Sequence, residues 1–443
     1  MEPIVLQQSG DMLPNWLWGY FIPIGLLLLV WGGLSPRKAR RVAPMAATAI
    51  ALAIFGYWAV GFALHMGGAQ AIHPDDSSLQ GLQALFSVVP SDPGWGIIGL
   101  AGFFLADPQA SSTMTTLFLA YLPLMATAVL MVTLALAQTR RWMMIVAGAL
   151  TGSVIVPVAA CWVWGSGWLS HLGQTLELGH GFVDFGGTTL VLWLPGMIVL
   201  PILLLQSREP ATDDPVAPPT YAPLMANVGA LLMGLGWAGW ALSQPFHIGG
   251  AVLDWPRSAL NMLLAMGGAV VTSQLYAWLV TGQPETLLAS QGLGAGWGAI
   301  LGCAPFLPSW GALLCGLLAG LAYPLIRYLV DSRLRIRDAA ASVALALTSG
   351  PIGFIAITLL ADGRWGQGWN RHGVTAEGVV TGSGVAGIFV SGTIGQLSAQ
   401  VVGLTAVGVW GLVWGVILGV IMSPRVLGRV GHHKAVSETT EDD

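Results

Sequence analysis

Two side chains at the ends of apolar segments have the chemistry to bind a small cation or a polar solute. Trp164 ends the fourth apolar segment, and an indole ring attracts an ammonium-type cation by up to about 2 kcal/mol when desolvated. An interfacial tryptophan in an aromatic belt is an equally good interpretation. Asp184 opens the fifth segment, where a carboxylate can accept backbone N–H bonds and favours the helix dipole. The sequence favours this capping role over direct contact with a substrate.

Ser243 ends the sixth apolar segment, so its hydroxyl could donate or accept a hydrogen bond at the mouth of a pore. A hydroxyl that simply lies at the membrane surface fits this position equally well. The candidate substrate-binding residues are therefore Trp164, Asp184 and Ser243.

The eight histidines all lie outside the middle of the apolar segments. His65 ends the second segment and could face a vestibule, but a hydrogen-bonded histidine at a helix end is the favoured interpretation. The other seven are interpreted as solvated residues of loops and the C-terminal tail: His73, His171, His180, His247, His372, His432 and His433. No apolar segment contains a nucleophile–base pair or a cluster of metal ligands. The sequence thus predicts no enzyme, no metal or cofactor, and no nucleic-acid partner.

The composition is that of a membrane protein. Of the 443 residues, 55% are hydrophobic and only 9% are charged, whereas about a quarter of a soluble domain is charged. Crossing the hydrocarbon core takes about 17 to 25 apolar residues in a helix. Eleven segments meet this requirement: 16–33, 43–64, 114–137, 142–164, 185–205, 222–242, 259–281, 287–305, 310–330, 339–361 and 396–422. Segment 94–106 is too short, and 379–394 is so rich in small polar residues that a re-entrant or packed surface segment is expected.

Basic residues predict the orientation, because they concentrate on the cytoplasmic side of membrane proteins. With these eleven spans, all but three of the 17 Lys and Arg residues fall on the side of the C-terminus; the exceptions are Arg257, Arg364 and Arg371. The N-terminus is therefore expected outside the cell and the C-terminus in the cytoplasm.

A polar, Pro-rich loop at 207–221 separates five spans from six, which indicates an inverted repeat of five plus five spans and one further helix. In span five Gly196 follows Leu192 by four residues, and in span ten Gly350 follows Ala346 by four, a spacing that lets helices approach closely. We expect one polytopic domain over 1–443. Its parts are a first repeat (1–206), a second repeat (222–361), the eleventh helix (396–422) and a cytoplasmic tail (423–443).

Short motifs occur in order along most of the chain. They are Trp31–Leu34, Trp164–Gly167, Asp184–Thr189, Gly236–Trp240, and Gln396 with Gln400. Together with eleven spans and the break after the fifth, this set resembles the ammonium transporter/Rh family. The resemblance implies an all-α integral membrane fold, a homotrimer with one pore per subunit, and ammonium or ammonia as the solute.

The chain departs from that family where the resemblance places the pore. The family has two facing histidines at mid-depth, and the matching positions here are Leu192 and Ala346. Ala120 and Leu124 match best to a pair of phenylalanines stacked above the pore. Leu192, Ala346, Leu124 and Ala120 are therefore the candidate pore-lining residues of a divergent member that lacks the twin histidines.

An unpaired cation does not cross an apolar route, because burying it costs many kcal/mol. The sequence thus favours a plasma-membrane channel, surrounded by lipid, that passes ammonia or another small neutral solute. The alternative is a non-conducting relative that acts as a sensor or scaffold.

Overall fold

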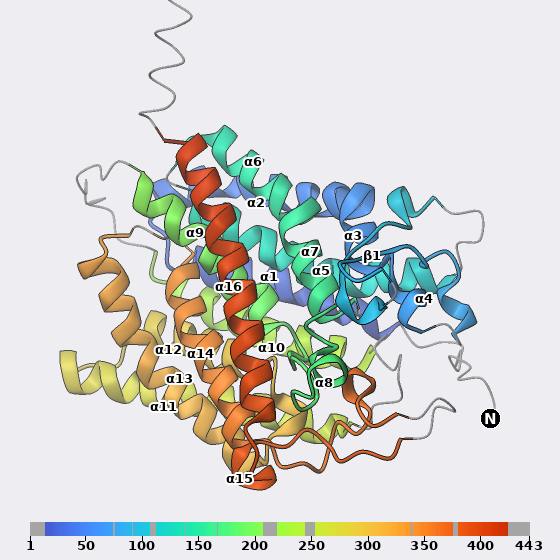
Figure 1. Cartoon of the computed structure of the whole chain (residues 1–443). Coiled ribbons are helices and arrows are strands. Elements are labelled where there is room, and N and C mark those ends of the chain that lie inside the picture. The colour runs from blue at the N-terminus through green and yellow to red at the C-terminus, as the bar shows by residue number, and fades with distance from the viewer. Residues whose placement is uncertain are drawn as a thin grey trace, which may run out of the picture.

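The computed structural model describes residues 14–73, 76–90, 92–106, 112–137, 139–165, 167–206, 219–243, 253–336, 338, 340–374 and 380–423. Long helices run side by side through the molecule, and α16 packs along α9 and α14 (Figure 1). Each of the eleven predicted apolar segments coincides with a helix in this structure. The predicted all-α membrane fold is thereby confirmed.

The first five predicted spans are helical, and three of them contain a π-helical turn. They are η1 and α1 (Asn15–Tyr20, Phe21–Trp31); α2, η2 and α3 (Pro36–Gly56, Tyr57–Gly61, Phe62–Met66); α5 (Ser112–Ala135); α6, η6 and α7 (Arg141–Leu150, Thr151–Ile155, Val156–Val163); and η7 with α9 (Thr188–Trp193, Leu194–Leu205). The π-helical turns of these five spans are η2 in span two, η6 in span four and η7 in span five. Such turns leave the regular i→i−4 hydrogen-bond ladder and often occur at functional sites.

The remaining six spans follow the loop at 207–221, of which 207–218 lie outside the described residues. They are α10 (Ala222–Ser243), α11 (Trp255–Thr281), α12 with η8 (Thr286–Ile300, Ala304–Phe306), α13 with η9 (Ser309–Tyr328, Leu329–Arg333), α14 (Ser342–Leu360) and α16 (Gly395–Ile421). Within the described residues, nine helices are long and apolar enough to cross a membrane. The two remaining predicted spans are the shorter apolar helix Trp16–Trp31 and the 15-residue α12.

Segment 94–106 is not a span, as its length predicted. It contributes β2 (Gly96–Gly99), which pairs antiparallel with β1 (Leu85–Ser87). The described part of 379–394 carries only α15 (Ile388–Ser391), on which Phe389 is 73% exposed, so this is a surface segment. The other short elements are α4 (Ala69–Ile72), η3 (Ser77–Leu79), η4 (Pro93–Trp95), η5 (Phe103–Leu105), α8 (Leu172–Thr175) and η10 (Trp369–Arg371).

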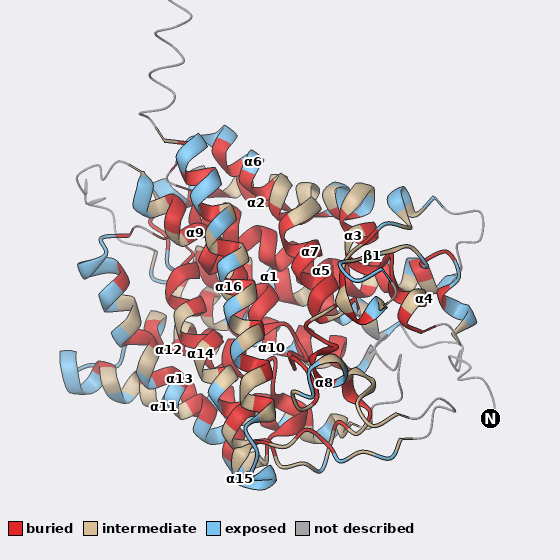
Figure 2. Ribbon diagram, viewed as in Figure 1, coloured by how far each residue is buried: buried red, intermediate tan, exposed pale blue. Residues whose placement is uncertain are grey.

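Burial divides the helices into a centre and a periphery (Figure 2). The most apolar stretch of α5 is 94% buried, whereas those of α11 and α16 are only 33% buried. Apolar residues on the outer faces of peripheral helices are exposed in the isolated chain, which is expected where a helix faces lipid. The helices approach closely where glycines meet: a Cβ added at Gly25 of α1 would collide with the carbonyl oxygen of Gly229 in α10.

Candidate functional site

The two spans that were predicted to line the pore cross at close range. Leu192 of η7 and Ala346 of α14 are both fully buried. A Cβ added at Gly196, one turn after Leu192, would collide with the Cβ of Ala346. A Cβ added at Gly298 of α12 would meet the side chains of Leu192 and Ser349. Leu192 and Ala346 therefore lie in one interface between η7, α9, α12 and α14, which we call the central crossing.

Two polar side chains at the central crossing donate hydrogen bonds to backbone carbonyls. The Thr348 hydroxyl donates to the Ala344 carbonyl at 2.7 Å, and the Ser349 hydroxyl donates to the Ala295 carbonyl at 3.4 Å. Asp184 and Asp338 are the buried carboxylates among the described residues, and each precedes one of the two crossing spans. Neither they nor a described histidine lie within η7, α9 or α14. The centre of the crossing thus offers a permeant mainly apolar side chains.

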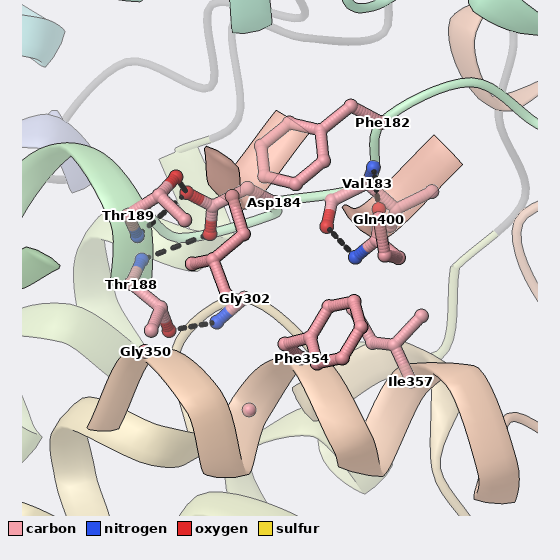
Figure 3. A pocket seen from close by; sticks show the side chains of 12 residues that line it. Phe182, Val183, Asp184, Thr188, Thr189, Gly302, Gly350, Phe354, Ile357 and Gln400 are labelled. Atoms are coloured by element: carbon pink, nitrogen blue, oxygen red, sulfur yellow. Dashed lines mark hydrogen bonds between the residues drawn. The ribbon is translucent and has the colours of Figure 1, made fainter. Parts of the chain in front are cut away.

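Asp184 organises the start of span five, as its predicted capping role requires. Its Oδ1 accepts the backbone N–H of Gly187 at 3.1 Å. Oδ1 also accepts the backbone N–H of Thr188 at 2.8 Å, and Oδ2 accepts that of Thr189 at 2.9 Å (Figure 3). The Thr189 hydroxyl also donates to Oδ2. Asp184 lies outside the spanning helix, and burial raises the pKa of its carboxyl while these four hydrogen bonds oppose the rise. All four donors come from span five itself, so the carboxylate serves this helix end.

A small cavity of about 20 Å³ lies beside Asp184, between the start of span five, the second half of α14 and the first half of α16 (Figure 3). Phe182, Phe354, Ile357 and Leu404 form much of its wall, and Thr188 contributes to the rest. A cavity of this size holds about one water-sized molecule.

Trp164 contacts the start of span five directly. Its indole Nε1 donates to the Asp184 carbonyl at 2.8 Å. Its ring lies over Gly187, where a Cβ would come within 2.8 Å of the indole. Gly187 has φ +85°, a left-handed conformation that favours glycine, so this residue meets both a steric and a backbone requirement. Through the motif Asp184–Thr189, the Asp184 carboxylate, the Trp164 ring and the start of span five thus contact one another at one place.

Trp164 also belongs to a group of four rings, Tyr57, His65, Tyr121 and Trp164, which we call the aromatic cluster. The ring of Tyr121 lies 5.4 Å from that of Trp164 and 4.7 Å from that of His65. His65 is fully buried, and its Nδ1 is 2.9 Å from the Tyr57 hydroxyl. The predicted hydrogen-bonded histidine at a helix end is therefore present, but it lies inside a cluster contributed by three spans.

Ala120 and Leu124, the predicted positions of the paired aromatic rings, are buried residues of α5. The aromatic residue of α5 that contacts Trp164 is Tyr121, one position after Ala120. Trp240 of α10 is fully buried and donates its indole N–H to the Ala120 carbonyl at 2.7 Å. The sequence analysis missed Tyr121 and Trp240. It matched positions along one helix at a time, and this does not show which side chains of neighbouring helices contact each other.

Ser243 is the last residue of α10, and its side chain lies outside the described part of the chain, as does His247. The prediction that the loop histidines are solvated is wrong for His73, His171 and His180, which are at most 8% exposed. Burial lowers the pKa of His73 to about 3 and that of His180 to about 4. His180 is held between loops, with Nε2 3.0 Å from the Ser383 carbonyl. His432 and His433 also lie outside the described residues.

These features, helices crossing at glycines with capped starts and an apolar centre, define a polytopic α-helical membrane protein. The sequence profile of the Ammonium Transporter Family matches residues 16–434. The chain therefore belongs to the ammonium transporter family, whose members are membrane channels or transporters and not enzymes.

Two named relatives are similar to this chain at 27% and 30% identity. Ammonium transporter Amt2 of Archaeoglobus fulgidus is 27% identical over 380 residues, covering 82% of this chain and 74% of its own. Ammonium transporter Amt1 of Haloferax mediterranei is 30% identical over 240 residues, covering 50% and 46%.

Solved structures share the fold at low identity. The structure of a protein named Sensor Amt Protein has a TM-score of 0.68 at 19% identity, covering 92% of this chain and 93% of its own. Mep2 of Saccharomyces cerevisiae has a TM-score of 0.68 at 20% identity, covering 93% and 85%.

Proposed function

We propose that this protein is a channel that passes ammonia, or another small uncharged solute, through the central crossing. The observation that carries the proposal is the burial of two apolar side chains, Leu192 and Ala346, where the helices of the predicted pore meet. A bare ammonium ion would lose its hydration there without gaining a partner, at a cost of many kcal/mol. Ammonium therefore releases its proton to water on the side from which it arrives, and only ammonia crosses.

The proposed access site lies at the Asp184 end of span five, with Trp164, Asp184 and Ser243 as its residues. Trp164 is its partly exposed aromatic member, and an indole face attracts ammonium before deprotonation. Asp184 contributes to the access site indirectly. Its carboxylate accepts the backbone N–H of Thr188 at the helix start, and its carbonyl accepts the indole N–H of Trp164. We place the protein in the plasma membrane, and the distribution of its basic residues supports an orientation with this end outside and the C-terminus in the cytoplasm.

We also propose that the chain forms a homotrimer in the lipid bilayer and that 1–206 and 222–361 are inverted repeats. Many large apolar side chains on α10, α11 and α13 are exposed in the isolated chain, including Leu263, Leu279 and Leu321. Such faces are covered in the membrane by lipid or by another subunit. Asp184 and Asp338 each accept backbone N–H groups at the start of their span, five and ten respectively, and this match supports the division into repeats.

A non-conducting sensor or scaffold is the second candidate function. It is favoured by the close packing at the central crossing, where Gly196 meets Ala346 and Gly298 meets Leu192. One solved protein with the same fold is named Sensor Amt Protein. Such a protein would bind ammonium at its access site and transmit the bound state without passing the solute.

Flux into proteoliposomes distinguishes these functions. An inward ammonium gradient should raise the internal pH faster in proteoliposomes than in protein-free liposomes, with no current across a planar bilayer. Ala346→Leu should abolish the difference, because the added side chain would overfill a contact that Gly196 already closes. The matched control is Gly267→Leu, at a glycine with open space around it. Alkalinisation equal to that of empty liposomes would favour the sensor, and an ammonium-dependent current would refute both candidates.

A further inference from the structure

An open cavity of about 630 Å³ lies where several helices end, away from the central crossing. It is bounded by the first turn of α11, the start of α13, the end of α14 and the short helix α15, at the bottom of Figure 1. Ligand sites have volumes of roughly 300–1,000 Å³, and this cavity falls within that range. We call it the α13–α15 cavity, and its wall includes Arg257, Trp310, Asp362, Arg364, Phe389 and Val390.

The polar wall of the cavity carries one positive charge in excess. The Arg257 guanidinium donates to the Leu307 carbonyl from Nε at 3.1 Å and from Nη2 at 2.7 Å, and it forms an ion pair with Asp362. Arg364 is exposed, and its guanidinium has no ion-pair or hydrogen-bond partner among the described residues. Asp254 accepts the backbone N–H of Arg257 as the cap of α11 and does not line the cavity. Arg364 can therefore pair with an anion from outside the chain.

The apolar wall is open to the surroundings of the chain. Phe389 and Val390 of α15 are 73% and 56% exposed, and Trp310 is 63% exposed (Figure 2). Trp310 begins a stripe of exposed side chains that follows one face of α13 at helical spacing and continues with Leu314, Leu318, Leu321 and Leu325. Because α13 is a membrane span, this stripe lies in the hydrocarbon and Trp310 lies at its surface, where tryptophan is enriched.

An unpaired cation at the membrane surface, next to an apolar stripe, has the layout of a site for an anionic phospholipid. A guanidinium donates two parallel N–H bonds to phosphate oxygens, and acyl chains cover apolar side chains. A water-soluble anion would pair with Arg364 but would leave Trp310 and Phe389 uncovered. A second copy of the chain would cover the stripe but would supply no anion unless a carboxylate met Arg364. A lipid brings both groups in one molecule.

We propose that the α13–α15 cavity binds an anionic phospholipid of the leaflet at this end of the spans, with its phosphate on Arg364 and one acyl chain along Trp310 and the α13 stripe. Arg257 is a positioning residue, because its contacts with Asp362 and the Leu307 carbonyl join the start of α11 to the ends of its neighbours. This inference goes beyond the proposed function and does not depend on whether the protein conducts.

A photoreactive phosphatidylglycerol tests the site. Full-length protein in phosphatidylcholine nanodiscs receives a trace of phosphatidylglycerol with a diazirine in one acyl chain, and the labelled peptides are identified by mass spectrometry. Label should concentrate on the peptides that contain Trp310 and Phe389, and unlabelled phosphatidylglycerol should displace it, whereas added phosphatidylcholine should not. Arg364→Gln should reduce this labelling about fivefold. The matched control is Arg333→Gln, at an exposed arginine at the far end of the same span, which should leave it unchanged.

A second pair of variants tests the apolar wall. Trp310→Ala should reduce the labelling of Phe389, whereas Trp278→Ala, at a tryptophan that is 58% exposed near the other end of α11, should not. Label spread evenly over the exposed faces of α10, α11 and α13, or displaced equally by both lipids, would overturn the site. An unlabelled cavity, together with Phe389→Cys subunits joined by a bismaleimide, would show that a second subunit covers it and would also overturn the proposal. Label at the cavity of a protein that shows no flux in liposomes would support the lipid site and contradict only the proposed channel.

Discussion

Spans five and ten begin in the same way although their sequences differ. In span five, Asp184 is followed after two residues by Gly187 at φ +85°, and the helix starts there. In span ten, Asp338 is followed after two residues by Ala341 at φ +54°, and the helix again starts there. Asp338 accepts the backbone N–H of Ala340 at 3.0 Å and of Val343 at 2.7 Å, as Asp184 does at its own helix.

The same register places Leu192 and Ala346 at equivalent positions, each five residues after the left-handed residue. The two ends differ in what surrounds the cap. Trp164 lies over Gly187 and joins it to the aromatic cluster, whereas the left-handed residue of span ten is an alanine and the next residue, Ser342, donates to the Met131 carbonyl at 3.0 Å. The comparison teaches that the carboxylate and the left-handed turn are common to both crossing spans, whereas the aromatic cluster lies at one of them only.

Gly187→Val should have the largest effect. A β-branched residue at positive φ is strained, and its side chain would displace Trp164, so we expect a loss of about 3 kcal/mol or more. The three cysteines are buried, so a thiol-reactive dye reports unfolding of detergent-solubilised protein on heating. Gly267→Val, in a helix with open space, is the control and should change the melting temperature little. Equal falls in melting temperature for Gly187→Val and Gly267→Val would contradict a specific requirement for glycine beneath Trp164.

Asp184→Ala should cost about 2 kcal/mol, because it leaves three buried backbone N–H groups without their acceptor. Asp338→Ala frees two such groups and should cost less. Thermal unfolding followed by the same dye compares the two. A larger loss of stability for Asp338→Ala than for Asp184→Ala would contradict the expectation that the cap with more hydrogen bonds, at Asp184, contributes more.

The Asp338 cap should make stability depend on pH. It lies outside the spanning helices, and burial raises the pKa of its carboxyl from 3.8 to about 6. Because the folded protein then holds this proton more tightly than the unfolded chain, the free energy of unfolding falls as pH rises through this interval. Between pH 5 and 7.5 this amounts to roughly 1 kcal/mol.

Asp338→Asn should abolish that part of the pH dependence, since an amide does not titrate. Melting followed by tryptophan fluorescence at both pH values measures the difference between wild type and variant. A difference that is the same at pH 5 and 7.5 would refute the raised pKa.

Ala341→Gly should have the smallest effect and the opposite sign. Alanine in the left-handed region costs about 1 kcal/mol, and glycine relieves it at some entropic cost, so a gain of a few tenths to 1 kcal/mol is expected. The reciprocal Gly187→Ala should destabilise. A lower melting temperature for Ala341→Gly would show that span ten does not start with the turn that span five uses.

Much of the fold could be predicted from the sequence. Apolar runs long enough to cross a bilayer predicted all eleven helices, because unpaired backbone groups are not tolerated in lipid and a long apolar run must therefore be helical. The spacing of Gly196 and Gly350 predicted close approach, and the structure places each at the partner span, against Ala346 and Trp193. The position of Asp184 before an apolar run predicted its capping role.

The aromatic cluster could not be predicted in this way. His65 carries no local signal, because a histidine at a helix end is common and its burial depends on Tyr121 and Trp164, which lie 56 and 99 residues further along the chain. The same holds for His73 and His180, which looked like loop residues and are buried by distant loops.

Hydrophobicity and helix caps are properties of a segment, and the amino-acid sequence by itself therefore determined the membrane fold, the spans and the apolar character at Leu192 and Ala346. Which side chains contact one another in the aromatic cluster depends on how three helices pack together. Only the tertiary structure decided that His65 keeps one nitrogen unsatisfied beside two aromatic rings, because the packing that buries it is made by contacts between spans and not within any one of them.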